Sequence, residues 1–93
     1  MLTLREVQEL MREMFYDRDA ARGVYATFAW LVEEVGELAE AILNNDREGI
    51  EEEIADVIAW TVSIANVLGV DVEEAFARKY RRAEGSRDTV VGI

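Results

Sequence analysis

The fold is decided by residues 24–68, which read VYATFAWLVEEVGELAEAILNNDREGIEEEIADVIAWTVSIANVL. On both sides of the polar residues 44–46, apolar side chains recur every three or four positions, as they do along one face of an amphipathic helix. The chain contains no proline that would interrupt either run. The pattern therefore predicts two long helices, 24–43 and 47–68, and the short connection between them requires the helices to run antiparallel.

A further helix is predicted before this pair. Thr3, followed by Glu6, has the spacing of a capping box and starts a first helix whose apolar stripe ends at Phe15. The polar segment Asp17–Gly23 is then expected to break the chain.

Another short helix is predicted after the pair. Gly69 is placed to end the 47–68 helix, and Asp71 begins a fourth helix that we expect to reach about Glu84. The tail, residues 85–93, is expected to be flexible or to be exchanged with a neighbouring subunit.

No segment shows the period-two alternation of a β-strand, so the predicted fold class is all-α, with four helices in a bundle-like arrangement. A chain of 93 residues is too short for two cores and is expected to form one domain, 1–93. Hydrophobic residues make up 51% of it, which is more than so small a domain buries by itself. We therefore expect a homo-oligomer, either a homodimer or a homotetramer.

The charge balance narrows the chemistry and the partners. The chain has 20 acidic and 10 basic residues, a net charge of −10, and neither histidine nor cysteine. Such a surface repels phosphate backbones, which argues against a nucleic acid or an anionic membrane as partner. Imidazole bases, thiolate nucleophiles, disulfides, zinc ribbons and iron–sulfur clusters are excluded. Since no secretory pattern or long apolar run is visible, we expect a cytoplasmic protein.

Two pairs of acids carry the functional argument. Glu34 with Glu37, and Glu53 with Asp56, are each spaced by three residues and share a helix face. In an antiparallel pair, facing residues have a constant sum of residue numbers, and Glu37 with Glu53 gives the same sum as Glu34 with Asp56. The four carboxylates are thus expected to converge. Because they repel one another, they require protonation or cations, and oxygen ligands suit Mg²⁺ or Mn²⁺.

The motif Glu-Glu-Val-Gly-Glu at 33–37, followed by Glu53-x-x-Asp56, resembles that of the MazG-type nucleoside triphosphate pyrophosphohydrolases, which are all-α enzymes. The resemblance implies Mg²⁺-dependent hydrolysis of an NTP or dNTP to the monophosphate and pyrophosphate, by attack of water on the α-phosphorus. It also implies that Glu34, Glu37, Glu53 and Asp56 bind the metal and that Glu33 either supports these ligands or orients the water.

The same resemblance implies that basic residues of the fourth helix bind the triphosphate, and Lys79 and Arg82 are the candidates. The sequence departs from the family pattern at Ala77, where an asparagine is common, and at Ala83, where a second arginine is common. The alternative is that these cations only complement the C-terminal end of a helix.

Trp30 and Trp60 obey the same register as the acids and are candidates for a wall that binds the nucleobase. The alternative is that they pack against another helix or subunit. Ser63 and Asn66 are expected either to contact a base edge or to face water.

Two other functions remain open at this point. The first is a non-enzymatic helical module for oligomerisation or regulation, in which the acids would serve only cation binding or solubility. Acid-rich helix faces are usually exposed to solvent, which favours this alternative. The second is an enzyme that hydrolyses a different phosphorylated small molecule, such as phosphoribosyl-ATP, which relatives in the superfamily cleave. A substrate panel separates these possibilities.

Overall fold

The structure is a computed structural model, and it describes residues 1–81. Within this range the chain forms four helices and no strand: α1 (Leu4–Arg22), α2 (Val24–Leu43), α3 (Arg47–Leu68) and α4 (Val72–Tyr80). The predicted all-α class is confirmed. No single helix of the described range is long and apolar enough to cross a membrane, although α3 and α4 pass that test as a pair bent by 104°.

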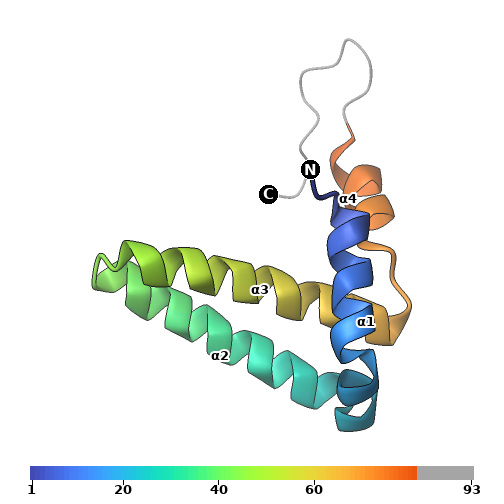
Figure 1. Ribbon diagram of the computed structural model, residues 1–93, viewed down its shortest axis with the longest axis horizontal. Helices are drawn as coiled ribbons and strands as arrows, with labels where there is room; N and C mark the ends of the chain where they lie inside the picture. Colours follow the sequence, from blue (N-terminus) through green and yellow to red (C-terminus); the bar gives the residue numbers. More distant parts are fainter. Residues whose placement is uncertain (82–93) are drawn as a thin grey trace.

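The long helices α2 and α3 form an antiparallel hairpin, with the bounds that the sequence predicted (Figure 1). The turn between them includes Asn45, which adopts a positive φ of 55°. Asp46 caps α3, since its side chain accepts a hydrogen bond from the backbone N–H of Gly49 at 3.0 Å. This hairpin fixes the register in which the acids of the two helices meet.

Helix α1 crosses the open end of the hairpin, opposite the α2–α3 turn, rather than running alongside it (Figure 1). The predicted capping box of Thr3 and Glu6 is present. The predicted break at Asp17–Gly23 is wrong, because the helix continues to Arg22 and only Gly23, with φ 97°, ends it. The polar residues of this segment stay helical since Asp19 is buried and paired with arginines on its own helix.

A buried network of amide groups joins α1 to α3 and to the link before α4. The Gln8 side chain donates to the Asn66 side chain at 3.0 Å and to the Val70 carbonyl at 2.7 Å, and it accepts from the Val72 N–H at 2.9 Å. Asn66 in turn donates to the Gln8 carbonyl at 3.1 Å. Asn66 was expected either to contact a base edge or to face water. Both expectations are wrong, because Asn66 is buried and its hydrogen bonds hold α1 and α3 together.

Helix α4 is shorter than predicted. Asp71 caps it by accepting from the Glu74 N–H at 2.9 Å, as expected, but the helix ends at Tyr80 and Arg81 is extended. Residues 82–93, which include Arg82, Ala83, Glu84 and the predicted tail 85–93, lie outside the described part of the chain.

The single chain has a very small apolar core. Only three of its described hydrophobic residues are fully buried, namely Ala41, Val62 and Ala65. Much of the apolar stripe predicted for α2 and α3 is instead about half exposed: Phe28, Val32, Val35, Ile42, Ile54 and Ile58. A face that would form the core of a bundle is therefore uncovered in one chain.

Candidate metal centre

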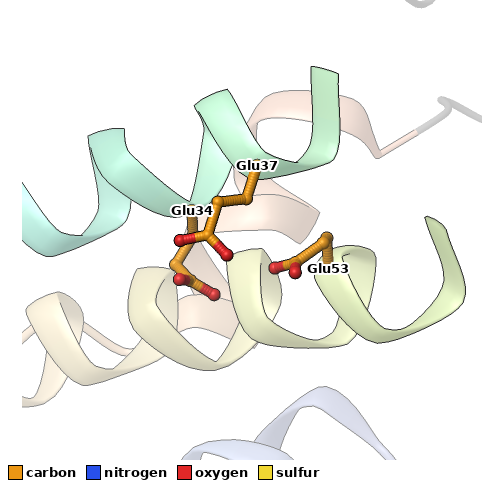
Figure 2. A group of neighbouring side chains, drawn as sticks. All are labelled: Glu34, Glu37 and Glu53. Carbon is orange, nitrogen blue, oxygen red and sulfur yellow. The ribbon is translucent and has the colours of Figure 1, made fainter. Parts of the chain in front are cut away.

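Three carboxylates from the two long helices meet in the space between them. Glu34 and Glu37 project from α2 and Glu53 from α3, as Figure 2 shows, and one oxygen of each lies within 4.8 Å of the others. The antiparallel register that the hairpin imposes brings them to this position. The convergence predicted from the matching spacing is therefore present for these three residues.

The arrangement fits a divalent cation with oxygen ligands. An ion bonded at roughly 2.0–2.6 Å to each oxygen can join oxygens that are roughly 4–5 Å apart. Glu53 also has an oxygen, Oε1, that is buried and has no hydrogen-bond partner among the described residues. A buried acceptor without a donor is costly, and a cation would satisfy it.

Loss of hydration and the close approach of the carboxylates raise the pKa values of two of them. The pKa of Glu34 is raised to about 7, first by loss of hydration, then by a hydrogen bond with Asp56 and by the charges of Glu37, Glu53 and Asp56. Loss of hydration also raises the pKa of Glu53, against a hydrogen bond with Glu34 that lowers it. Without a cation, Glu34 is thus about half protonated near neutral pH.

Asp56 completes the group through this hydrogen bond with Glu34. Its carboxylate is not among the three clustered oxygens, and the residue is exposed. It lines a cavity of about 140 Å³ together with residues of α1 and α3: Met11, Phe15, Arg18, Ala59, Trp60 and Ser63. Ser63, which is buried, therefore faces the site rather than bulk water.

The two tryptophans stack on each other beside the acids. The ring centroids of Trp30 and Trp60 are 6.0 Å apart and the planes differ by 11°. This lies within the roughly 4.5–7 Å of contacting aromatic pairs, so the rings do not form two sides of a slot. The guanidinium of Arg22, from α1, lies 5.9 Å from the Trp30 ring and 5.5 Å from the Trp60 ring. The rings thus pack against α1, the alternative raised above, while a base-binding role for their exposed faces stays a prediction.

Comparison with known proteins identifies the family of the chain. The sequence matches the MazG nucleotide pyrophosphohydrolase domain over residues 22–89. The chain belongs to the MazG nucleotide pyrophosphohydrolase family. A protein of Cyanophage S-2L, named dATP/dGTP diphosphohydrolase, is 35% identical over 77 residues, which are 83% of this chain and 70% of that protein.

Membership identifies this MazG chain as a nucleotide pyrophosphohydrolase. The matched range contains α2, α3 and α4, and so all four of the predicted metal ligands. It begins at Arg22, the last residue of α1.

The remaining predicted residues of the MazG site are placed as follows. Glu33 is exposed on α2 and is not part of the group of three clustered carboxylates. Lys79 lines a separate pocket between the C-terminal half of α3 and α4, and none of the four acids lines that pocket. Arg82 lies outside the described residues. The roles of these three residues stay predictions.

Sequence reasoning missed the basic residues that α1 brings to the site. Arg18 lines the cavity that contains Asp56, and Arg22 lies over the tryptophan pair. Both were assigned to a break in the chain. The available signal was their spacing of four residues, which places two arginines on one face once the segment is taken as helical.

Proposed function

We propose that this MazG domain hydrolyses a nucleoside or deoxynucleoside triphosphate to the monophosphate and pyrophosphate, with Mg²⁺ held by Glu34, Glu37, Glu53 and Asp56. The observation that carries the proposal is the meeting of three carboxylate oxygens within 4.8 Å, with Asp56 hydrogen-bonded to one of them. The name of the cyanophage relative makes dATP and dGTP the first substrates to test. Mn²⁺ would fit the same oxygen ligands.

In the proposed reaction, water attacks the α-phosphorus and the bond to the oxygen that bridges to the β-phosphorus breaks. A bound Mg²⁺ would neutralise charge on the phosphate oxygens and favour deprotonation of water. The carboxylates would hold the cation between the two helices, and Glu34 would be ionised when it serves as a ligand. Glu33, next to this ligand, is proposed to orient the attacking water.

Substitution of the ligands tests the proposal. The chain is incubated with each NTP and dNTP and Mg²⁺, and pyrophosphate is measured. Glu37→Gln and Asp56→Asn are expected to lower turnover at least about 100-fold, because even residues that only support metal ligands commonly cost 10–100-fold. Glu40→Gln, an exposed acid one turn further along α2, is the matched control and is expected to stay near wild type.

Other outcomes would contradict the proposal. Turnover that is unchanged in Glu37→Gln and Asp56→Asn would remove the carboxylates from the reaction. Cleavage of phosphoribosyl-ATP, without cleavage of any NTP or dNTP, would replace the substrate class.

We further propose that the domain assembles as a homodimer or homotetramer. The support is the apolar face of α2 and α3, on which Val32 is 54% exposed and Ile58 is 45% exposed. Exposed apolar surface of this extent on a small domain is typical of an interface between chains.

A further inference from the structure

Asp19, in the last two turns of α1, is a buried charge whose role the carboxylate centre does not explain. Its side chain is 1% exposed, and its Oδ1 atom accepts hydrogen bonds from Arg18 Nε at 3.2 Å and Arg18 Nη2 at 3.0 Å. Arg22 Nη1 lies 3.8 Å from the same oxygen. A buried carboxylate needs such partners, so Asp19 and the two arginines form one unit.

The contacts of Arg18 fix the direction of its guanidinium. The group lies 4.2 Å from the Phe15 ring centroid and 5.2 Å from that of Trp60, so aromatic rings of both α1 and α3 contact it. Two of its nitrogens bond Asp19, and Nη1 has no partner among the described residues. The side chain is 44% exposed, and Nη1 keeps N–H donors that these contacts do not use.

The position of Arg18 relates it to the metal ligands. Arg18 and Asp56 line the same cavity of about 140 Å³, and Asp56 shares a hydrogen bond with Glu34. Water takes roughly 30 Å³ per molecule in the liquid, so this cavity is large enough for a group the size of a phosphate. A guanidinium presents paired N–H donors that match phosphate oxygens.

Electrostatics also requires a cation on this side of the site. A triphosphate that approaches four carboxylates is repelled, and divalent ions held by those carboxylates cannot contact every phosphate oxygen. Several other arginines of the described range are paired with acids elsewhere, as Arg5 is with Asp71 and Arg78 with Glu74. Arg18 is paired too, but with the buried carboxylate of Asp19, and it lines the same cavity as Asp56.

We propose that Arg18 binds the triphosphate of the substrate beside the carboxylate centre, and that Asp19 is the positioning residue that holds its guanidinium there. The inference rests on the proposed function and extends it to a residue outside the range matched by the family, 22–89. The competing explanation is structural: Arg18 would only balance Asp19 and cover the Trp60 ring.

The test compares Arg18→Gln with wild type in two measurements. The first is turnover of the preferred triphosphate. The second is binding of a non-hydrolysable α,β-imido triphosphate and of the matching nucleoside in the presence of Mg²⁺. Both tryptophans of the chain lie in this cluster, so intrinsic fluorescence reports on it directly. Arg12→Gln is the matched control, since Arg12 is also on α1 but pairs with the exposed Glu9.

Because Arg18→Gln removes a charge-assisted hydrogen bond, we expect it to raise KM and to weaken binding of the imido triphosphate, each about 10- to 100-fold. The affinity for the nucleoside, which has no phosphate, is expected to stay the same, and Arg12→Gln is expected to stay within about twofold of wild type. Asp19→Asn, which loosens the hold on the guanidinium, is expected to raise KM in the same way but less.

Two results would overturn the assignment. One is an Arg18→Gln variant with wild-type KM and wild-type affinity for the imido triphosphate. The other is a parallel loss of nucleoside and triphosphate affinity, which is the signature of a structural role. If Arg18→Gln does not fold by circular dichroism, Arg18→Lys replaces it, because it keeps the charge but not the paired donors.

The wild-type chain separates this inference from the proposed function. Wild-type turnover that is lost in Glu37→Gln but unchanged in Arg18→Gln would reject the role of Arg18 alone. A wild-type chain that neither hydrolyses triphosphates nor binds the imido analogue would reject both.

Discussion

At the scale of single residues, the site is a set of acids whose ionisation depends on what lies between them. Glu34 has neighbours of its own charge on both helices and is only partly exposed, and its pKa is raised to about 7. With this pKa, the carboxyl group of Glu34 holds a proton below about pH 7. A divalent cation would take the place of that proton, which couples metal binding to pH.

The pKa of Glu34 predicts how the stability of the metal-free chain depends on pH. Between its ordinary value of 4.5 and its folded value of about 7, the folded state holds a proton that the unfolded state has lost. Stability therefore falls as pH rises through this window and stays low above it. We expect the melting temperature in chelator to drop between about pH 5 and pH 7.5, and added Mg²⁺ at pH 7.5 to restore it.

Thermal melts across this pH range, with and without Mg²⁺, provide the measurement. Glu34→Gln is the control, and both the pH slope and the Mg²⁺ shift should shrink in it. Asp71, whose pKa is lowered by the hydrogen bond from the Glu74 backbone, loses its stabilising effect only in more acidic solution. A pH-independent melt in chelator, or no response to Mg²⁺, would show that the acids do not interact as the structure has them.

At the scale of helices, the ends decide where the site-bearing elements lie. Helix α3 ends in a Schellman motif, in which the Val70 N–H donates to the Ala65 carbonyl at 2.9 Å and Gly69 adopts φ 73°. This sharp end directs the chain into α4 and brings Val70 to Gln8 of α1. The position of α1, and so of Arg18, depends on this end of α3.

Two glycine substitutions test the role of this helix end, and we expect them to change the free energy of unfolding in opposite directions. Gly69→Ala forces a left-handed conformation on alanine and is expected to cost about 1–2 kcal/mol. Gly36→Ala places a methyl group in the middle of α2 with no atom within 4 Å, and is expected to gain about 0.5–1 kcal/mol.

Urea unfolding of both variants measures the difference. If Gly69→Ala is as stable as wild type, the end of α3 does not control the fold. If Gly36→Ala is destabilised, a second chain packs closely against that part of α2.

At the scale of the whole molecule, a single chain is an incomplete fold. The α2–α3 hairpin has α1 across one end, and its apolar face is left uncovered over much of its length (Figure 1). Phe28, Val35 and Ile54, which belong to the apolar stripes of the two helices, are each about half exposed. Covering this face with another copy would bury them without changing the register of the acids.

Assembly can be tested by a charge placed on this face. Wild type is expected to elute with the mass of a dimer or tetramer in light scattering. Ile58→Glu is expected to weaken association at least about 100-fold, because the interface would bury an unpaired carboxylate. Tyr25→Glu, at a residue 88% exposed near the start of α2, is the matched control and should keep the wild-type mass. A monomeric wild type at micromolar concentration would refute the assembly.

The sequence by itself determined the helices of the hairpin and the meeting of its acids. Both follow from local rules: apolar spacing sets the two long helices, a short turn makes them antiparallel, and antiparallel register pairs Glu37 with Glu53 and Glu34 with Asp56. The range matched by the family, 22–89, contains both helices and these acids.

Only the tertiary structure decided what α1 contributes. In the sequence, its last two turns have the polar composition of a break. They stay helical because Asp19 is buried and paired with Arg18, and this burial depends on the packing of α1 across the hairpin. The same packing made Asn66, a candidate base contact, a partner of Gln8, and it placed Arg18 and Asp56 in the lining of one cavity. Contacts between residues so distant in the chain are fixed by how helices cross, which no local spacing records.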